Sequence, residues 1–169
     1  VAYALVHLAR IRPYGGPVLD PFCGSGTVLF EAASLYPDVK VHGSDLFDKA
    51  VEGTRANAQA VGLGGRLLLR QGDACDLSSV YPDRCFQAII ADPPYGVRQG
   101  RRLNFYWLYS RFLAGACALL APGGRLVVIA WKRGVFERVL RDMDCFVVQQ
   151  ILAVETGGIY PRVYVLRPK

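Results

Sequence analysis

The sequence predicts an α/β fold in which an open, mostly parallel sheet of seven strands is covered by helices on both faces. Short apolar runs suited to buried strands alternate along the chain with segments of helical periodicity. A polar stretch, Asp92-Pro93-Pro94-Tyr95, directly follows one such run, and ligands of open α/β sheets bind at that end of the strands. The last two apolar runs flank Gly157-Gly158, a pattern typical of an antiparallel hairpin.

The composition predicts a single globular domain. The chain has 169 residues, of which 52% are hydrophobic and 20% charged, and its net charge of +6 is compatible with an anionic partner such as nucleic acid. The five cysteines include no CxxC pair, so we expect neither a disulfide framework nor a metal, and a reducing cytoplasmic location. The longest apolar runs are too short to span a bilayer, so we expect no membrane partner. We also expect a monomer.

In the first half of the chain, turn residues separate the elements. Pro13 and Gly15 end the first helix, and a glycine-rich loop over 20–27 links the first strand to the second helix. Asp48 can cap the third helix, which stops at Gly62. We predict helices at 1–11, 28–35 and 48–61, and strands at 18–19, 39–43 and 67–69.

In the second half, the apolar run 86–91 is a strand, and Asn104 can cap a helix that Pro122-Gly123-Gly124 ends. We assign the aromatic residues of that helix, Tyr106, Trp107 and Tyr109, to the core in preference to a base-stacking surface. We predict further strands at 126–131, 146–154 and 159–166, and a helix at 135–143.

The glycine-rich loop restricts which ligand the sheet edge can bind. Gly24 and Gly26 allow a sharp turn and a close approach to a ligand, but Leu29 stands where a dinucleotide fingerprint has its third glycine. Asp20 at the start of the loop disfavours a phosphate and favours a cation. An NAD site is therefore disfavoured.

Two further acids end neighbouring strands. Asp45 can accept both hydroxyls of a ribose, and Asp73 can accept from an adenine amino group. Together with a cation acceptor at Asp20, they would satisfy S-adenosylmethionine, which carries an ammonium, a sulfonium, a ribose and an adenine. The alternative for Asp45 and Asp73 is a local role as a helix cap or turn.

The loop Asp-Pro-Phe-Cys-Gly-Ser-Gly-Thr at 20–27 and the stretch Asp-Pro-Pro-Tyr-Gly at 92–96 resemble the S-adenosylmethionine-dependent amino-methyltransferases. The chain is most similar to the catalytic domain of the THUMP-containing RNA guanine-N2 methyltransferases, which act on tRNA and rRNA. The resemblance covers nearly the whole chain. It implies a Rossmann-like class I methyltransferase fold with strand order 3-2-1-4-5-7-6. It also implies that residues 1–169 are one catalytic domain that lacks an N-terminal RNA-binding THUMP module.

The resemblance also implies a site, with S-adenosylmethionine as cofactor, no metal, and RNA, in particular tRNA, as partner. The catalytic residues would be Asp92, Pro93, Pro94 and Tyr95. The cofactor would contact Asp20, Phe22, Gly24, Ser25, Gly26, Thr27, Asp45, Leu46, Asp73, Ala74 and Asp92. The substrate RNA would contact Tyr95, Arg98, Arg101 and Arg102, although a solvated loop is the alternative for the three arginines.

The chemistry of an exocyclic amine explains the Asp-Pro-Pro-Tyr stretch. Such an amine is a poor nucleophile because its lone pair is delocalised into the ring. The Asp92 carboxylate and the Pro93 carbonyl can accept its two N–H bonds, and the prolines make this arrangement rigid. Tyr95 can stack on a base that has been flipped out of a helix.

Three other functions compete with this assignment. An adenine-N6 methyltransferase of DNA or RNA shares the four-residue motif, but the DNA enzymes usually carry a long target-recognition insert for which no room remains. Enzymes that methylate a protein glutamine amide typically have Asn in place of Asp92. A non-catalytic RNA-binding module is the alternative from another class, and the intact glycine loop, Asp45 and Asp92 argue against it.

Overall fold

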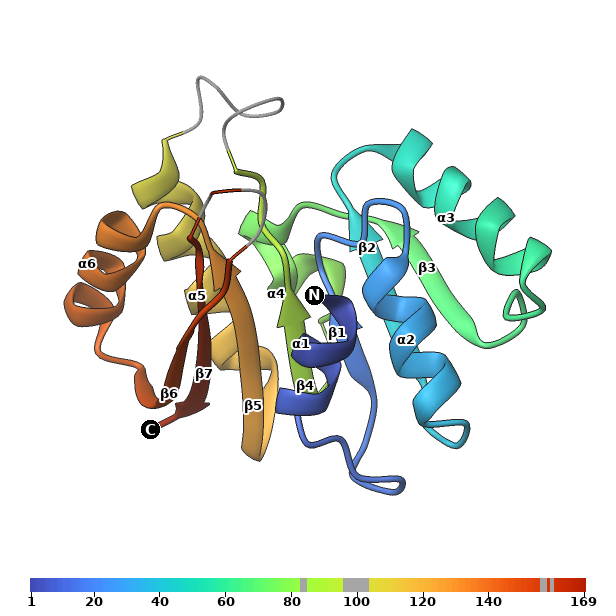
Figure 1. Cartoon of the computed structure of the whole chain (residues 1–169), viewed down its shortest axis with the longest axis horizontal. Helices are drawn as coiled ribbons and strands as arrows, with labels where there is room; N and C mark the ends of the chain where they lie inside the picture. Colours follow the sequence, from blue (N-terminus) through green and yellow to red (C-terminus); the bar gives the residue numbers. More distant parts are fainter. Residues whose placement is uncertain (83–84, 96–103, 156–157, 159) are drawn as a thin grey trace.

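A computed structural model describes residues 1–82, 85–95, 104–155, 158 and 160–169 of the chain. One seven-stranded sheet crosses the molecule in the order β3-β2-β1-β4-β5-β7-β6 (Figure 1). Strand β7 runs antiparallel to both of its neighbours, while the other pairs along the sheet are parallel. The predicted strand order and the antiparallel C-terminal hairpin are therefore confirmed.

The strands agree with the predicted runs to within a few residues, except at the start of β5. Their bounds are β1 Val18–Asp20, β2 Val41–Asp45, β3 Leu67–Gln71, β4 Phe86–Ala91, β5 Leu120–Ala130, β6 Phe146–Ala153 and β7 Arg162–Pro168. The helical segments are α1 Ala2–Leu8, α2 Thr27–Leu35, α3 Asp48–Ala60, the 3-10 turn η1 Ala74–Asp76, α4 Leu77–Val80, α5 Phe105–Leu119 and α6 Arg133–Met143.

Two apolar clusters form the core, one on each face of the sheet. Helices α1, α2 and α3 contribute to one cluster, and α4, α5 and α6 to the other. Strand β5 serves both, since Leu126 and Val128 point into the second cluster and Val127 and Ile129 into the first. This three-layer arrangement brings the carboxyl ends of the parallel strands to one edge, at the top of Figure 1. No helix in the described ranges has the length and apolar character needed to cross a membrane.

Several predicted boundaries were wrong. Helix α1 ends at Leu8, because Arg10 takes a left-handed conformation with φ of 48°. Asp48 lies in the first turn of α3, where Phe47 is the N-cap and no side chain caps the helix. The Pro122-Gly123-Gly124 stretch does not end α5, because the helix stops at Leu119 and β5 begins at once. The short segments η1 and α4 were not predicted.

Candidate active site

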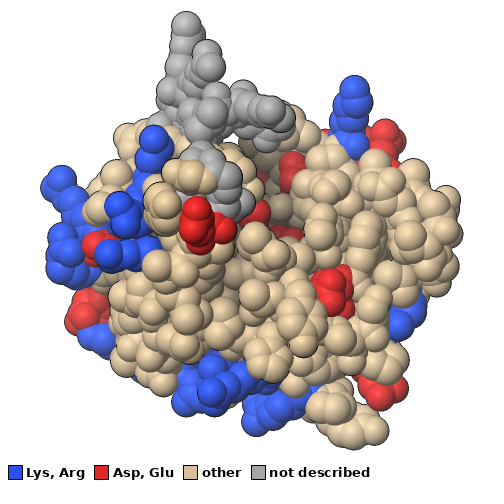
Figure 2. Space-filling view, viewed as in Figure 1, with Lys and Arg blue, Asp and Glu red and all other residues tan. Residues whose placement is uncertain are grey.

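Acidic residues stand at the carboxyl ends of four neighbouring strands. Asp20 and Asp45 are the last residues of β1 and β2, Asp73 follows β3 by two residues, and Asp92 follows β4 by one. Figure 2 shows acidic atoms inside a hollow in the upper part of the molecule, between the half that carries α3 and the half that carries α6. The sheet therefore gathers the acids that the sequence placed at separate strand ends.

The glycine-rich loop between β1 and α2 is held in one conformation by β2 and α3. Gly24 N–H donates to Asp45 Oδ2 at 3.0 Å, and Thr54 Oγ1 donates to the Gly24 carbonyl at 2.7 Å. Gly26 is the left-handed N-cap of α2, with φ of 89°. A Cβ atom there would lie 2.6 Å from Phe30 Cζ and 2.8 Å from Thr54 Cγ2, so only glycine fits.

Asp20 is a buried carboxyl group, 3% exposed, at the foot of this loop. Its Oδ1 accepts a hydrogen bond from Phe22 N–H at 3.0 Å. Burial raises the pKa of Asp20 from 3.8 to about 8, and repulsion from Asp92 and Asp45 adds to the rise. Among the described residues Asp20 has no ion-pair partner, so a cationic ligand would suit it.

Asp45 and Asp73 both have a local structural role, which was the alternative for them. The two oxygens of Asp45 accept from the backbone N–H groups of Gly24 and Phe47, at 3.0 and 3.1 Å. Asp73 caps η1, with its Oδ1 accepting from Cys75 N–H at 2.8 Å. A carboxylate offers about four lone-pair positions, so both groups keep acceptor capacity for a ligand.

The Asp92-Pro93-Pro94-Tyr95 stretch leaves β4 as an extended segment without helix or strand. Tyr95 Oη donates to Asp92 Oδ2 at 2.9 Å, while Asp92 Oδ1 is buried and without a hydrogen-bond partner among the described residues. Burial raises the pKa of Asp92, whereas the Tyr95 hydroxyl and the Trp131 N–H act to lower it. The pKa of Tyr95 is raised to about 12, chiefly by burial and also by the charge of Asp92, so its hydroxyl remains a donor at neutral pH.

Trp131 is a site residue that sequence reasoning missed. It follows β5, the next strand along the edge, and its ring centroid lies 4.0 Å from that of Tyr95. Its Nε1 is buried and has no hydrogen-bond partner among the described residues, and the indole N–H acts to lower the pKa of the nearby Asp92. The sequence feature that could have identified Trp131 is its position directly after a predicted strand, since in a parallel sheet that position lies at the same edge as Asp92.

The other predicted cofactor residues line the same edge with different exposure. Ser25 and Thr27 are exposed and have their hydroxyls 3.3 Å apart. Phe22 packs edge-on against Phe112, with ring centroids 5.2 Å apart, which ties the loop to the core. Leu46 is exposed and Ala74 is buried. The predicted RNA contacts Arg98, Arg101 and Arg102 lie outside the described residues.

The aromatic residues at the start of α5 divide into two groups. Tyr109 is buried, as predicted, but Tyr106 and Trp107 are 40% and 52% exposed, so their assignment to the core was wrong. Tyr106 Oη donates to Asp142, and the Arg138 guanidinium lies over the Tyr106 ring. A surface pocket of about 530 Å³ opens beside them, lined by Asn104, Tyr106, Gly134, Val135 and Arg138.

The strand order, the glycine loop and the acidic edge define a Rossmann-like class I methyltransferase domain. The chain belongs to the UPF0020 family, "RMKL-like, methyltransferase domain", whose family model matches residues 1–160. No group of three or more histidine, cysteine or acidic residues in the described part of the chain is arranged to hold a metal ion.

Several characterised proteins are similar to this chain. A tRNA (guanine(6)-N2)-methyltransferase of Thermus thermophilus is 43% identical over 167 residues, which are 98% of this chain and 48% of the relative. A tRNA (guanine(10)-N2)-dimethyltransferase of Methanothermobacter thermautotrophicus is 38% identical over 133 residues, 77% of this chain and 37% of the relative. The crystal structure of TrmN from Thermus thermophilus superposes with a TM-score of 0.88 at 39% identity, covering 99% of this chain and 48% of that one. The chain thus spans about half the length, or less, of these relatives.

Proposed function

We propose that this domain transfers a methyl group from S-adenosylmethionine to an exocyclic amine of RNA, N2 of a guanine in tRNA. The observation that carries the proposal is Asp92, a partly buried carboxylate at the sheet edge. Among the described residues its Oδ1 has no hydrogen-bond partner, and its Oδ2 accepts from the Tyr95 hydroxyl. Two relatives that cover most of this chain are named as tRNA guanine-N2 methyltransferases, and a third is named as a U6 snRNA (guanine-N(2))-methyltransferase, which supports guanine N2 as the target.

The residues present fit S-adenosylmethionine. The buried Asp20, whose pKa is raised by burial and by neighbouring acids, would hold the cationic part of the molecule. Asp45 would hold the ribose and Asp73 the adenine, each with acceptor capacity left after its backbone hydrogen bonds. The open side of the loop at Gly24, where an added Cβ would meet only Phe22 O at 3.9 Å, leaves space for a ligand to approach. The bound cofactor supplies the electrophilic methyl group.

The residues of this chain would prepare the amine. One N–H of the target base takes the place of the Tyr95 hydroxyl at Asp92 Oδ2, and the Pro93 carbonyl accepts the other. The released Tyr95, now free of Asp92, packs on the flipped base. Since the prolines fix the backbone, the acceptors need no reorganisation during the reaction.

We also propose that residues 1–169 act together with a separate RNA-binding module of the THUMP kind. A pocket for a single flipped guanine contacts too few groups to distinguish one guanine of a folded RNA from another. The test is mass spectrometry of nucleosides from undermodified tRNA and rRNA, incubated with methyl donor and either this chain or the chain extended at its N-terminus. N2-methylguanosine formed faster by the extended protein is the expected result. Production of N6-methyladenosine, or of no methylated nucleoside by either protein, would contradict the proposal.

A further inference from the structure

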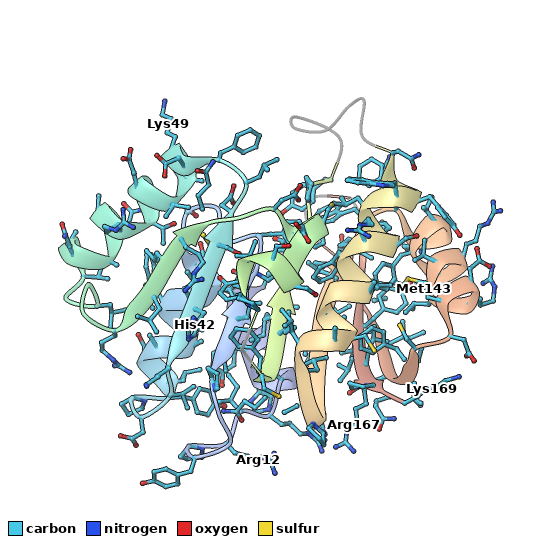
Figure 3. The ribbon with its side chains drawn as sticks, turned by 180° about the vertical axis from the view of Figure 1, so that it is seen from behind. Arg12, His42, Lys49, Met143, Arg167 and Lys169 are labelled. Carbon is cyan, nitrogen blue, oxygen red and sulfur yellow. The ribbon has the colours of Figure 1, made fainter. Side chains whose placement is uncertain are left out.

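Four arginines lie toward the end of the molecule opposite the candidate active site. Arg10 and Arg12 follow α1, while Arg125 lies in β5 and Arg167 in β7. Figure 3 shows Arg12 and Arg167 at the same lower end of the molecule, and Figure 2 shows basic side chains gathered along that end. We refer to Arg10, Arg125 and Arg167 as the arginine cluster.

The sheet register brings two members of the cluster face to face. The antiparallel pairing of β5 and β7 includes Leu126 opposite Leu166, so Arg125 and Arg167 are opposed one step further along. Arg125 and Arg167 each lie two residues along their strand from a residue of the α1-side core, Val127 and Val165 respectively, and side chains two residues apart in a strand lie on the same face. Both arginines are therefore on the α1 face of the sheet. Like charges directly opposed across an antiparallel pair destabilise a sheet.

Arg10 brings a third charge to this position through an unfavourable backbone conformation. Its φ of 48° lies in the left-handed region, which glycine usually occupies after a helix. Burial lowers the pKa of Arg125, and repulsion from Arg167 and Arg10 lowers it further, in agreement with the closeness of these charges. Within the described ranges none of the three has an ion-pair partner, and Arg167 Nε is buried with no hydrogen-bond partner.

A neighbouring hydrogen-bond clamp fixes the position of Arg12 and the segment that follows α1. The side chain of Gln87, 6% exposed in β4, accepts from Arg12 N–H at 2.8 Å and donates to the Arg12 carbonyl at 3.0 Å. The segment that carries Arg10 and Arg12 is thus held beside β4. Strained or repulsive arrangements that a fold nevertheless holds in place are typical of binding sites.

We propose that the arginine cluster is a phosphate-binding site for the RNA backbone, separate from the catalytic pocket. Guanidinium groups match phosphate oxygens through paired hydrogen bonds, and one phosphate between Arg125 and Arg167 would convert their repulsion into attraction. Arg125 lies within β5, and Trp131 follows the last residue of that strand, so the two sites are separated by roughly 20 Å along the strand. Structured RNA is recognised through phosphate contacts spread over such distances.

The RNA part of this inference rests on the proposed function, so its test uses two readouts. The double variant Arg125→Gln with Arg167→Gln is compared with Arg55→Gln plus Arg141→Gln, which removes the same charge from two exposed helix positions. Arg10→Gln is a further variant that leaves both strands unchanged. The first readout is thermal unfolding in inorganic phosphate against chloride at equal ionic strength. Phosphate should stabilise the wild-type chain and the control, and should lose this effect in the double variant.

The second readout is the salt dependence of binding to a fluorescently labelled tRNA transcript. Loss of two phosphate contacts should reduce the slope of log K against log salt by roughly 1.4 to 1.8 and weaken binding on the order of tenfold at 0.1 M salt. Cofactor affinity and turnover at saturating tRNA should not change, so KM rises while kcat stays constant.

The outcomes separate this inference from the proposed function. Equal salt slopes, combined with a phosphate effect that only the double variant loses, would show that the cluster binds another anion, such as a carboxylate of an adjoining domain, and would overturn the RNA assignment. If neither readout responds, the cluster is an ordinary solvated surface. If the salt slopes differ as expected but no methylated nucleoside forms, the RNA site stands and the proposed reaction fails.

Discussion

The two ends of the parallel strands carry side chains of opposite charge, acidic at the carboxyl edge and basic at the amino edge. The two kinds of side chain differ in whether they can lose their charge near neutral pH. At the carboxyl edge, the buried Asp20 lies near the partly buried Asp92, and burial raises the pKa of both. At the amino edge of β5, Arg125 and Arg167 oppose each other, and the pKa of Arg125 is lowered. In both places like charges are held together without a partner of opposite sign among the described residues.

The difference lies in how each edge could respond to the repulsion. An aspartic acid can bind a proton near neutral pH, as Asp20 does with its pKa of about 8, whereas an arginine stays charged. Without a bound cation, Asp20 at the carboxyl edge can therefore be protonated and neutral. The arginines at the amino edge cannot lose their charge in this way, so only a bound anion can reduce their mutual repulsion. The following variants test whether the two edges differ in this way, beginning with the largest expected effect.

Replacement of Asp92 should have the largest effect. Asp92→Ala should lower the rate of methyl transfer on the order of a thousandfold while the cofactor still binds, because the acceptor for the amine is lost. Asp92→Asn should keep part of the activity, since an amide oxygen still accepts one N–H. Single-turnover transfer of a labelled methyl group is the measurement, with the exposed Asp38→Ala as control. If the Asn variant is as inactive as the Ala variant, Asp92 acts as a base and the positioning argument is wrong.

The second variant tests the proton at Asp20. The folded-state pKa of about 8 exceeds the ordinary value of 3.8, so between these values the folded chain holds a proton that the unfolded chain has lost. The contribution of Asp20 to stability is therefore fully present below pH 4 and declines as the pH rises toward 8. We expect a slope of about 1 kcal/mol per pH unit, absent in Asp20→Asn. Urea unfolding from pH 5 to 8 without ligand measures it, and equal slopes in both proteins would refute this account.

The third variant concerns the ribose acceptor. Asp45→Ala should weaken binding of S-adenosylhomocysteine by about 1–3 kcal/mol through loss of two hydrogen bonds. Because Asp45 also accepts from Gly24 and Phe47, Asp45→Asn serves as the matched variant that keeps the side-chain volume. Titration calorimetry gives both affinities. An unchanged affinity in Asp45→Ala would show that other groups hold the ribose.

The smallest effect is expected at the amino edge. Arg10→Gly should stabilise the folded chain by about 1 kcal/mol, because glycine adopts positive φ without the penalty of a Cβ atom. Arg10→Gln keeps the backbone strain and removes only the charge, so the difference between the two variants isolates the strain. The midpoint of urea unfolding at low salt is the measurement. A less stable Arg10→Gly would mean that Arg10 makes favourable contacts that outweigh its conformation.

Local patterns predicted the carboxyl edge well. The bounds of β4 follow from an apolar run whose six residues are all buried, and the acids at Asp20, Asp45, Asp73 and Asp92 follow from their positions after strands. The register between strands is not encoded locally. For this reason the approach of Trp131 to Tyr95, and of Arg125 to Arg167, could not be predicted from sequence alone.

Turn residues and aromatic residues were the weaker signals. The Pro122-Gly123-Gly124 stretch predicts the end of a helix. In the structure it lies within β5, near the register shift between Phe86 and Ala88 of β4. Such irregularities let a strand accept proline and glycine. Trp107 stands in the first turn of α5, and the residues three and four positions further on, Ser110 and Arg111, are polar. It therefore lies off the apolar face of the helix.

The position of β7 determines when the sheet can be completed during protein synthesis. This strand is inserted between β5 and β6, although it is made after both. Until residues 162–168 have left the ribosome, β5 has an unpaired edge and β6 has no neighbour. Unpaired strand edges promote association between nascent chains. A translation stop before residue 162 would therefore release a chain in which the edge of β5 stays unpaired and promotes aggregation, and slow decoding just upstream would prolong its dependence on chaperones.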